Sequence, residues 1–233
     1  MKILVLSSGG VDSTTCLAMA VRRAGAENVL ALSVSYGQKH RRELQAAKAV
    51  AEHYGVRLLE LDLAAVFAGS DCSLLAHSGK EIPKASYAGQ QSSGGPVSTY
   101  VPFRNGLFLS AAASVALSHG CDSLMYGAHA DDAAGAAYPD CSLPFVEAMG
   151  TAICEGTGGQ LRLEAPFVSV SKAEVVRTGL ALGVPYEKTW SCYEGGDVPC
   201  CKCGTCLDRL EAFRKNGVSD PLLGAEQSKR SVR

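Results

Sequence analysis

Two spacings of apolar residues recur along the chain, and they predict strands and helices in turn. Apolar runs typical of buried strands occur at residues 2–6, 28–36, 56–63, 123–129 and 161–167. Segments with helical spacing occur at residues 14–21, 41–54, 106–118, 145–154, 171–183 and 207–216. This order predicts an α/β fold whose core is an open, doubly wound, mostly parallel sheet.

The turn between the first strand and the first helix reads SGGVDS at residues 8–13. Its two glycines let the backbone approach a ligand, and the free amides at a helix start favour an anion such as phosphate. Ser8, Ser13 and Thr14 add hydroxyl donors. Asp12 places a carboxylate beside the phosphates, as a magnesium-dependent reaction requires. The alternative is an ordinary strand-to-helix turn capped by a serine.

The two better-known phosphate-binding sequences do not occur in the chain. Gly79 and Lys80 are followed by Glu81, which excludes a Walker-type loop, and no G-x-G-x-x-G follows a strand. Residues 8–13 instead resemble the S-G-G-x-D-S loop of the N-type ATP pyrophosphatases, the PP-loop family. The resemblance implies an adenine nucleotide alpha hydrolase-like fold and cleavage of ATP to AMP and pyrophosphate, with adenylylation of a substrate oxygen. It implies nucleotide contacts from Ser8, Gly9, Gly10, Val11, Asp12, Ser13 and Thr14.

Several polar residues fall where predicted strands end or helices begin. Ligands of open parallel sheets bind at the carboxyl ends of the strands, so these residues should share one rim. We expect Ser33 to contact the nucleotide, Arg104 to bind a phosphate or carboxylate, and Lys172 to direct its ammonium towards phosphate. Asp131 and Asp132 are candidates for contact with magnesium or substrate. For each, the alternative is a solvent-exposed or capping side chain.

Five of the ten cysteines lie between residues 192 and 206. Cys192, Cys200, Cys203 and Cys206 have the spacing in which thiolates bind one tetrahedral ion, which predicts a structural zinc knuckle at about residues 190–207. An iron–sulfur cluster is the chemical rival, and buried free cysteines are a third possibility. Cys201 is a further thiol that can substitute for a neighbour.

Length, composition and charge limit the remaining choices. The chain has 233 residues, 47% apolar and 19% charged, as expected for one globular domain over residues 1–233. Its formal net charge of -1 gives no broad basic surface for nucleic acid. No apolar run is long enough to cross a membrane and no signal-peptide pattern appears, so we expect a cytoplasmic protein without a membrane partner.

Two segments differ in composition from the rest. Residues 64–100 are rich in Gly, Ser, Ala and Gln and include the tract QQSSGGP at residues 90–96. A loop of this length predicts a mobile cover over the site, or else a plain surface insertion. The last ten residues are polar and basic, and we expect them to be frayed.

A more specific resemblance rests on residues 8–13, 35–41, 100–105, 127–132, 138–141 and 189–193, together with the cysteines beyond them. These segments are similar to those of the 7-cyano-7-deazaguanine synthases, the QueC family of queuosine biosynthesis. The resemblance implies conversion of 7-carboxy-7-deazaguanine, ammonium and ATP to the nitrile, with structural Zn²⁺, Mg²⁺ bound with ATP, and a homodimer. The family usually has glycine where Cys201 stands, which favours Cys200 as the metal ligand.

The implied reaction suits the chemistry of the predicted rim. A carboxylate is a poor electrophile, but its adenylate has a good leaving group, so ammonia forms the amide; a second adenylylation, of the amide oxygen, then permits the nitrile. We expect the catalytic residues to be Asp12, Ser13, Lys172, Asp131 and Asp132. The alternatives are a PP-loop sulfur-transfer enzyme acting on tRNA, which needs a reactive thiol such as Cys141, and a non-catalytic nucleotide- or zinc-binding module.

Overall fold

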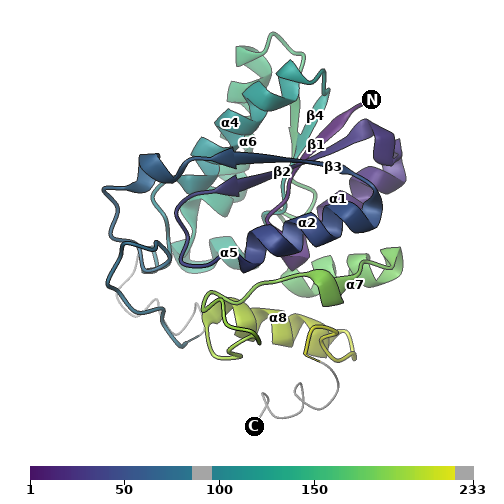
Figure 1. The fold of residues 1–233 in the computed structure, drawn as a ribbon. Coiled ribbons are helices and arrows are strands. Elements are labelled where there is room, and N and C mark those ends of the chain that lie inside the picture. The colour runs from purple at the N-terminus through teal and green to yellow at the C-terminus, as the bar shows by residue number, and fades with distance from the viewer. Residues whose placement is uncertain (86–95, 224–233) are drawn as a thin grey trace.

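The computed structural model describes residues 1–85 and 96–223, and their strands form one five-stranded, all-parallel sheet (Figure 1). The strand order is β3-β2-β1-β4-β5. The strands are β1 (Ile3–Leu6), β2 (Val29–Ser35), β3 (Arg57–Asp62), β4 (Ser123–Met125) and β5 (Arg162–Glu164). The predicted α/β fold with a parallel sheet is therefore confirmed.

Helices cover both faces of this sheet. The α-helices are α1 (Val11–Ala24), α2 (Arg42–Tyr54), α4 (Arg104–Ser118), α5 (Ala130–Ala133), α6 (Leu143–Gly156), α7 (Lys172–Leu182) and α8 (Gly204–Lys215). Short 3₁₀ helices span Ala26–Asn28, Ala64–Phe67, Ala134–Ala136, Pro139–Cys141 and Tyr186–Lys188. Figure 1 shows α1, α2 and α7 on one face and α4 and α6 on the other, with α8 packed beyond α7.

The continuous apolar run of β1 follows from this double cover. Ile3 and Val5 lie in the core cluster shared with α1, α2, α7 and α8. Leu4 and Leu6 point the other way and pack in the cluster shared with α4 and α6. Since successive side chains of a strand face opposite sides, a strand covered on both faces needs apolar residues at every position.

The strand order places a crevice at one edge of the sheet. The chain moves from β1 to β2 and β3 on one side and then returns to β4 and β5 on the other. The carboxyl ends of β1 and β4 thus mark the point where the strand order reverses, which is where open α/β sheets bind ligands. The loop at residues 8–13 follows β1, and residues 126–132 follow β4.

Two boundaries differ from the sequence prediction at this crevice. Helix α1 begins at Val11, so Asp12 and Ser13 lie in its first turn and not in a loop before it. Strand β4 ends at Met125, short of the predicted residue 129, because the chain passes against α1 at Gly127. A Cβ on Gly127 would lie 2.9 Å from the carbonyl carbon of Asp12, so only glycine permits this approach.

The described part of residues 64–100 packs into the protein. Phe67, Leu74, Leu75 and Ile82 are buried in a third core cluster, which also contains Trp190 and three cysteines of the C-terminal cluster. A plain surface insertion is therefore wrong for these residues. Residues 86–95 of this segment and the tail at residues 224–233, predicted to be frayed, lie outside the described residues, and a mobile cover formed by residues 64–100 stays a prediction.

Among the described residues, no helix is long and apolar enough to cross a membrane. The expectation that residues 1–233 form one domain stays a prediction.

Candidate active site

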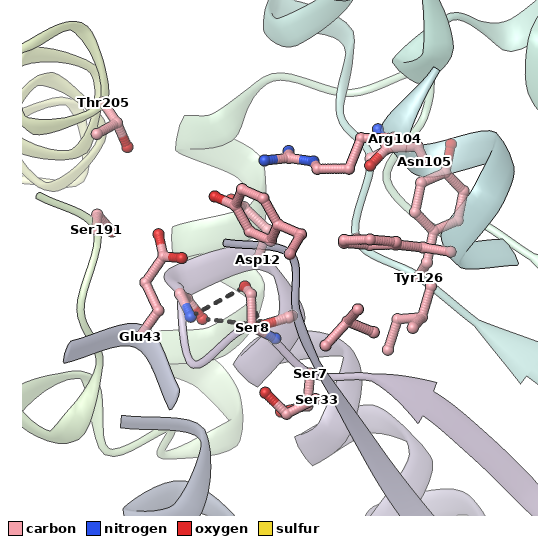
Figure 2. Close-up of a pocket in the computed structure, with 18 of the residues that line it drawn as sticks. Ser7, Ser8, Asp12, Ser33, Glu43, Arg104, Asn105, Tyr126, Ser191 and Thr205 are labelled. Atoms are coloured by element: carbon pink, nitrogen blue, oxygen red, sulfur yellow. Dashed lines mark hydrogen bonds between the residues drawn. The ribbon is translucent and has the colours of Figure 1, made fainter. Parts of the chain in front are cut away.

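The loop at residues 8–13 is held by its glycines and its serines. Gly9 has a φ of +78°, and a Cβ there would lie 2.6 Å from the carbonyl oxygen of Glu43 at the start of α2, so glycine is required. The amide of Ser8 donates to Oγ of Ser13 at 3.2 Å, and the two hydroxyls lie 3.1 Å apart. Figure 2 shows Ser8 in the pocket, with dashed lines for its hydrogen bonds. The amide of Trp190 donates to the carbonyl of Gly9 at 2.9 Å, which joins the loop to the C-terminal segment.

Several buried polar atoms around this loop have no hydrogen-bond partner within the described chain. They are Oγ of Ser7, Oδ1 of Asp12, Oγ1 of Thr14, Oγ of Ser33 and Nδ1 of His129. Ser7 and Ser33 stand at the carboxyl ends of β1 and β2, and Figure 2 shows them side by side below the loop. Because buried polar groups are normally paired, these atoms, with the amides at the start of α1, indicate a site for a polar, anionic ligand.

A cluster of charged side chains lies behind the loop. Nζ of Lys172 is 2.9 Å from Oδ2 of Asp12 and 3.2 Å from Nε2 of His129. His129 is fully buried, and its Nε2 is also 3.2 Å from Oδ2 of Asp132. Asp12 of α1, Asp132 of α5 and Lys172 of α7 thus meet around His129, the residue that precedes α5.

The charges of this cluster stabilise one another. Burial favours the neutral amine of Lys172, but Asp12 and Asp132 outweigh it and raise its pKa to about 12. Burial likewise opposes ionisation of Asp12, yet the Lys172 ammonium and His129 hold its pKa below the ordinary value. The site therefore contains a fixed ammonium and a fixed carboxylate at neutral pH.

Two acidic residues complete the surroundings of Lys172. Oδ2 of Asp131 accepts a hydrogen bond from the backbone amide of Lys172 at 2.8 Å, so Asp131 caps the start of α7. Asp208, on α8, has a pKa raised to about 6 because burial and the charge of Asp132 oppose the attraction of Lys172. Sequence reasoning missed Asp208 and His129. A strand-end position was the only available sign for His129, and nothing local marked Asp208.

The cavity in front of the loop has a volume of about 220 Å³. Its far wall is aromatic and charged: the guanidinium of Arg104 lies over the ring of Tyr36 at 5.0 Å and that of Phe108 at 5.9 Å. Burial opposes the charge of Arg104, but the neighbouring acidic and phenolic groups raise its pKa further. Glu43 faces the same cavity, and burial raises its pKa to about 7 against the opposing effect of Arg104.

The start of α4 is anchored by Asp140. The backbone amide of Asn105 donates to Oδ2 of Asp140 at 2.9 Å, and the Asn105 side chain donates to Sγ of Cys141 at 3.2 Å. Burial and the nearby carboxylates raise the pKa of Cys141 well above its ordinary value. Cys141 is therefore a buried thiol that resists ionisation, although it lines the cavity.

Four cysteine sulfurs gather beside the far wall. Those of Cys192, Cys200, Cys203 and Cys206 all lie within 4.8 Å of one another. The amides of Lys202 and Cys203 point at Sγ of Cys200, at 3.4 and 3.3 Å, as expected for a sulfur that ligates a metal in a tight turn. The amide of Cys200 likewise donates to Sγ of Cys192 at 3.3 Å. The arrangement is that of a metal-binding site.

Cys201 is not part of this cluster. Its φ is +57°, a left-handed conformation that glycine adopts without strain. Its thiol makes a 3.5 Å contact with the carbonyl of Pro199 and does not join the four sulfurs. The backbone thus turns Cys201 away, and Cys200 is the thiol that lies with the other three sulfurs.

A model of the family described as "Queuosine biosynthesis protein QueC" matches residues 2–217 of the chain. A 7-cyano-7-deazaguanine synthase of Archaeoglobus fulgidus is 44% identical over 100% of this chain and 94% of its own length. Proteins of the same name from Caldicellulosiruptor saccharolyticus and Thermoplasma acidophilum are 43% and 41% identical, each over 95% of this chain and 95% and 91% of their own. This chain belongs to the QueC family.

A solved structure shares the fold of this QueC-family chain. It is the U34-tRNA thiolase NcsA from Methanococcus maripaludis with its 4Fe-4S cluster, which is 17% identical, with a TM-score of 0.51 over 99% of this chain and 72% of that one. At this identity the likeness shows the fold alone and nothing about substrate.

Most of the residues predicted to form the site line the cavity of this QueC-family chain. Its lining includes Ser8, Gly10, Asp12, Ser13, Ser33, Arg104, Asp132 and Lys172. Four others do not line it: Gly9 packs against α2, Val11 and Thr14 are buried within α1, and Asp131 caps α7. Glu43, Tyr36 and Asn105 line the cavity without having been predicted as site residues.

Proposed function

We propose that the protein is an ATP-dependent 7-cyano-7-deazaguanine synthase of queuosine biosynthesis, which converts 7-carboxy-7-deazaguanine and ammonia to the nitrile. The observation that supports this most strongly is the 44% identity to a synthase over the whole of this chain and 94% of that protein. The site supplies the required parts: a loop for phosphates and a fixed ammonium at Lys172, beside a cavity large enough for a planar base.

The first half-reaction activates the carboxylate. The loop amides and the hydroxyls of Ser8 and Ser13 hold the phosphates, while the carboxylate oxygen attacks the α-phosphorus of ATP and pyrophosphate leaves. Lys172 neutralises the charge that develops on the departing pyrophosphate, because its raised pKa keeps it protonated. Ammonia then attacks the acyl adenylate, expels AMP, releases a proton and leaves the amide.

The second half-reaction repeats this sequence on the amide. The amide oxygen attacks a second ATP, pyrophosphate leaves, and loss of AMP with two protons from nitrogen gives the nitrile. One loop and one lysine serve both steps. Asp12 and Asp132 are the carboxylates placed to hold the Mg²⁺ that accompanies ATP, and the unpartnered Oδ1 of Asp12 fits that role. The ion would polarise the phosphates.

We propose that the four-cysteine site holds a structural zinc. Four thiolates about 2.3 Å from one ion would place their sulfurs roughly 3.8 Å apart, which agrees with sulfurs gathered within 4.8 Å. Four protein ligands leave no open position for a reactant. Metal analysis tests this proposal. Iron together with visible charge-transfer absorption would show that the site holds an iron–sulfur cluster and not zinc.

The sulfur-transfer alternative is disfavoured by the state of Cys141. A thiol that accepts and transfers sulfur must ionise, whereas burial raises the pKa of this one. The family resemblance also supports a homodimer. The ten free cysteines fit the reducing environment of the cytoplasm.

The deciding experiment is mass spectrometry of the products after incubation with the carboxylate, ammonium, magnesium and ATP. We expect the nitrile and two AMP for each nitrile formed. Lys172→Met should abolish both products while it leaves the cysteine site loaded with metal. If the wild-type protein does not convert any deazaguanine acid, the proposal is wrong.

A further inference from the structure

We propose that Glu43 reads the purine edge of the substrate, with its carboxylate accepting hydrogen bonds from N1–H and the 2-amino group of the deazaguanine ring. This inference rests on the proposed function and adds a residue that determines base specificity.

The first observation is the position of Glu43. It lies in the first turn of α2, and its backbone carbonyl oxygen packs so closely against Gly9 of the loop that it leaves no room for a Cβ there. Figure 2 shows the carboxylate of Glu43 and the guanidinium of Arg104 entering the cavity from two different walls, with Ser8 and Asp12 at its base. A base held by Glu43 therefore lies within the same cavity as the phosphate loop.

The second observation is that this carboxylate lacks a fixed protein partner. Within residues 1–85 and 96–223 its oxygens form no hydrogen bond and no ion pair within 4.0 Å, whereas the carboxylates of Asp131, Asp132 and Asp140 each have a partner. The charge of Arg104 acts on Glu43, yet the Arg104 guanidinium lies over the rings of Tyr36 and Phe108. Burial raises the pKa of Glu43 to about 7, which shows that the cavity disfavours the bare anion.

The chemistry of guanine supplies what Glu43 lacks. N1–H and the 2-amino group are adjacent donors in one plane, and they match the two oxygens of a carboxylate. Adenine presents an acceptor at N1 and has no 2-amino group, so the same carboxylate repels it. Glu43 would thereby exclude the adenine of ATP from the position of the acid substrate. The rings of Tyr36 and Phe108, with the guanidinium of Arg104 over them, belong to the lining of the same cavity.

A structural role is the competing explanation. If Glu43 only supported α2 or balanced the charge of Arg104, its replacement would alter stability or ATP binding as much as base binding. The test must therefore compare bases that differ in one donor.

The experiment measures equilibrium binding by calorimetry, without ATP, of 7-carboxy-7-deazaguanine and of the same acid without its 2-amino group. We expect wild-type protein to bind the full base ~10²-fold more tightly, because the analogue leaves a buried acceptor unpaired. Glu43→Gln should lose most of that preference and raise KM for the acid, with KM for ATP unchanged. Glu52→Gln, an exposed position on the same helix, is the matched control and should keep the wild-type preference.

The outcomes separate this inference from the proposed function. If wild-type protein shows no preference for the 2-amino base, edge reading by Glu43 is wrong, whether or not the nitrile forms. If Glu43→Gln keeps the preference, another residue reads the edge. If the preference exists and depends on Glu43 but no nitrile forms, the inference stands and the synthase proposal fails.

Discussion

The loop at residues 8–13 and the segment at residues 190–206 face the same cavity but are held by different interactions. The loop is set by consecutive elements: β1, two glycines and the first turn of α1. Residues 190–206 contain no strand and reach helix geometry only at α8. Their position depends on four sulfurs and on contacts distant in sequence, such as the bond from Trp190 to Gly9. One wall is thus built from local backbone geometry, and the other from a metal site and tertiary contacts.

The largest expected effect is on the metal-held wall. Cys206→Ser removes one of four ligands and should cause loss of metal and of folded yield, because metal binding contributes to folding, by roughly 10–16 kcal/mol in zinc-finger peptides. Metal per chain and thermal unfolding are the measurements. Cys201→Gly is the matched control and should keep one ion per chain, since its φ of +57° suits glycine. Full metal content in Cys206→Ser would show that the four-sulfur assignment is wrong.

A buried ion pair tests whether tertiary contacts hold the same wall without the metal. Arg209 binds Asp220 through Nε and Nη2 at 2.7 and 2.8 Å and also donates to Oγ1 of Thr189 at 2.7 Å. Arg209→Met should cost about 3–5 kcal/mol in unfolding free energy, because Asp220 becomes a buried, unpaired charge.

Denaturant unfolding measures the effect of Arg209→Met. Arg214→Met, which breaks an exposed pair with Glu211, should change stability little. Equal losses in the two variants would mean that the buried pair does not support the wall.

Asp12→Ala tests the loop wall, where the effect should be catalytic. The change removes the partner of Lys172 and a proposed magnesium ligand, so both half-reactions should slow by ~10²-fold or more. Rates of carboxylate to amide and of synthetic amide to nitrile are measured separately, with Asp62→Ala at the exposed end of β3 as control. A wild-type rate for amide to nitrile would require a second site.

The smallest expected effect is on the pH dependence of stability, and it concerns Asp208. This residue belongs to α8 but lies near Lys172, which contacts the loop at residues 8–13. Its pKa is about 6 in the folded protein against an ordinary value of 3.8, so the folded protein holds this proton more tightly than the unfolded chain does. The stabilisation is present below about pH 4 and is lost as pH rises through 6. Asp208→Asn should therefore be more stable than wild type at pH 7, by about 1 kcal/mol after solvent screening. Thermal unfolding at pH 4.5 and 7 checks it, and a gain independent of pH would contradict it.

The loop wall could be predicted from the sequence because its determinants are contiguous. A strand, two glycines and a helix start fix residues 8–13, and a local capping box begins α7, where the amide of Ser171 donates to Glu174 at 3.1 Å. This capping places Lys172 at the predicted rim. Its contact with Asp12 follows from the common sheet edge, which the strand order predicts.

The opposite wall could be predicted only in part. The cysteine spacing indicated a metal site, but the choice between Cys200 and Cys201 depends on a backbone angle that spacing does not contain. Glu43 and Asp208 carry no local sign of their role, since each looks like an ordinary acidic residue on an amphipathic helix. Glu43 reaches the cavity only because α2 packs on Gly9, and Asp208 comes near Lys172 only because α8 packs on α7.

The hydrogen bond from the amide of Trp190 to the carbonyl of Gly9 makes the two walls thermodynamic partners. Any free energy by which a bound metal orders the loop must reappear as free energy by which bound nucleotide retains the metal, because coupling between two binding equilibria is reciprocal. ATP should accordingly raise the affinity for the metal, measured in competition with a chelator, and removal of the metal should weaken ATP binding by the same factor. The cysteine cluster, although it offers no open coordination position, would then set the affinity of a site that it does not touch.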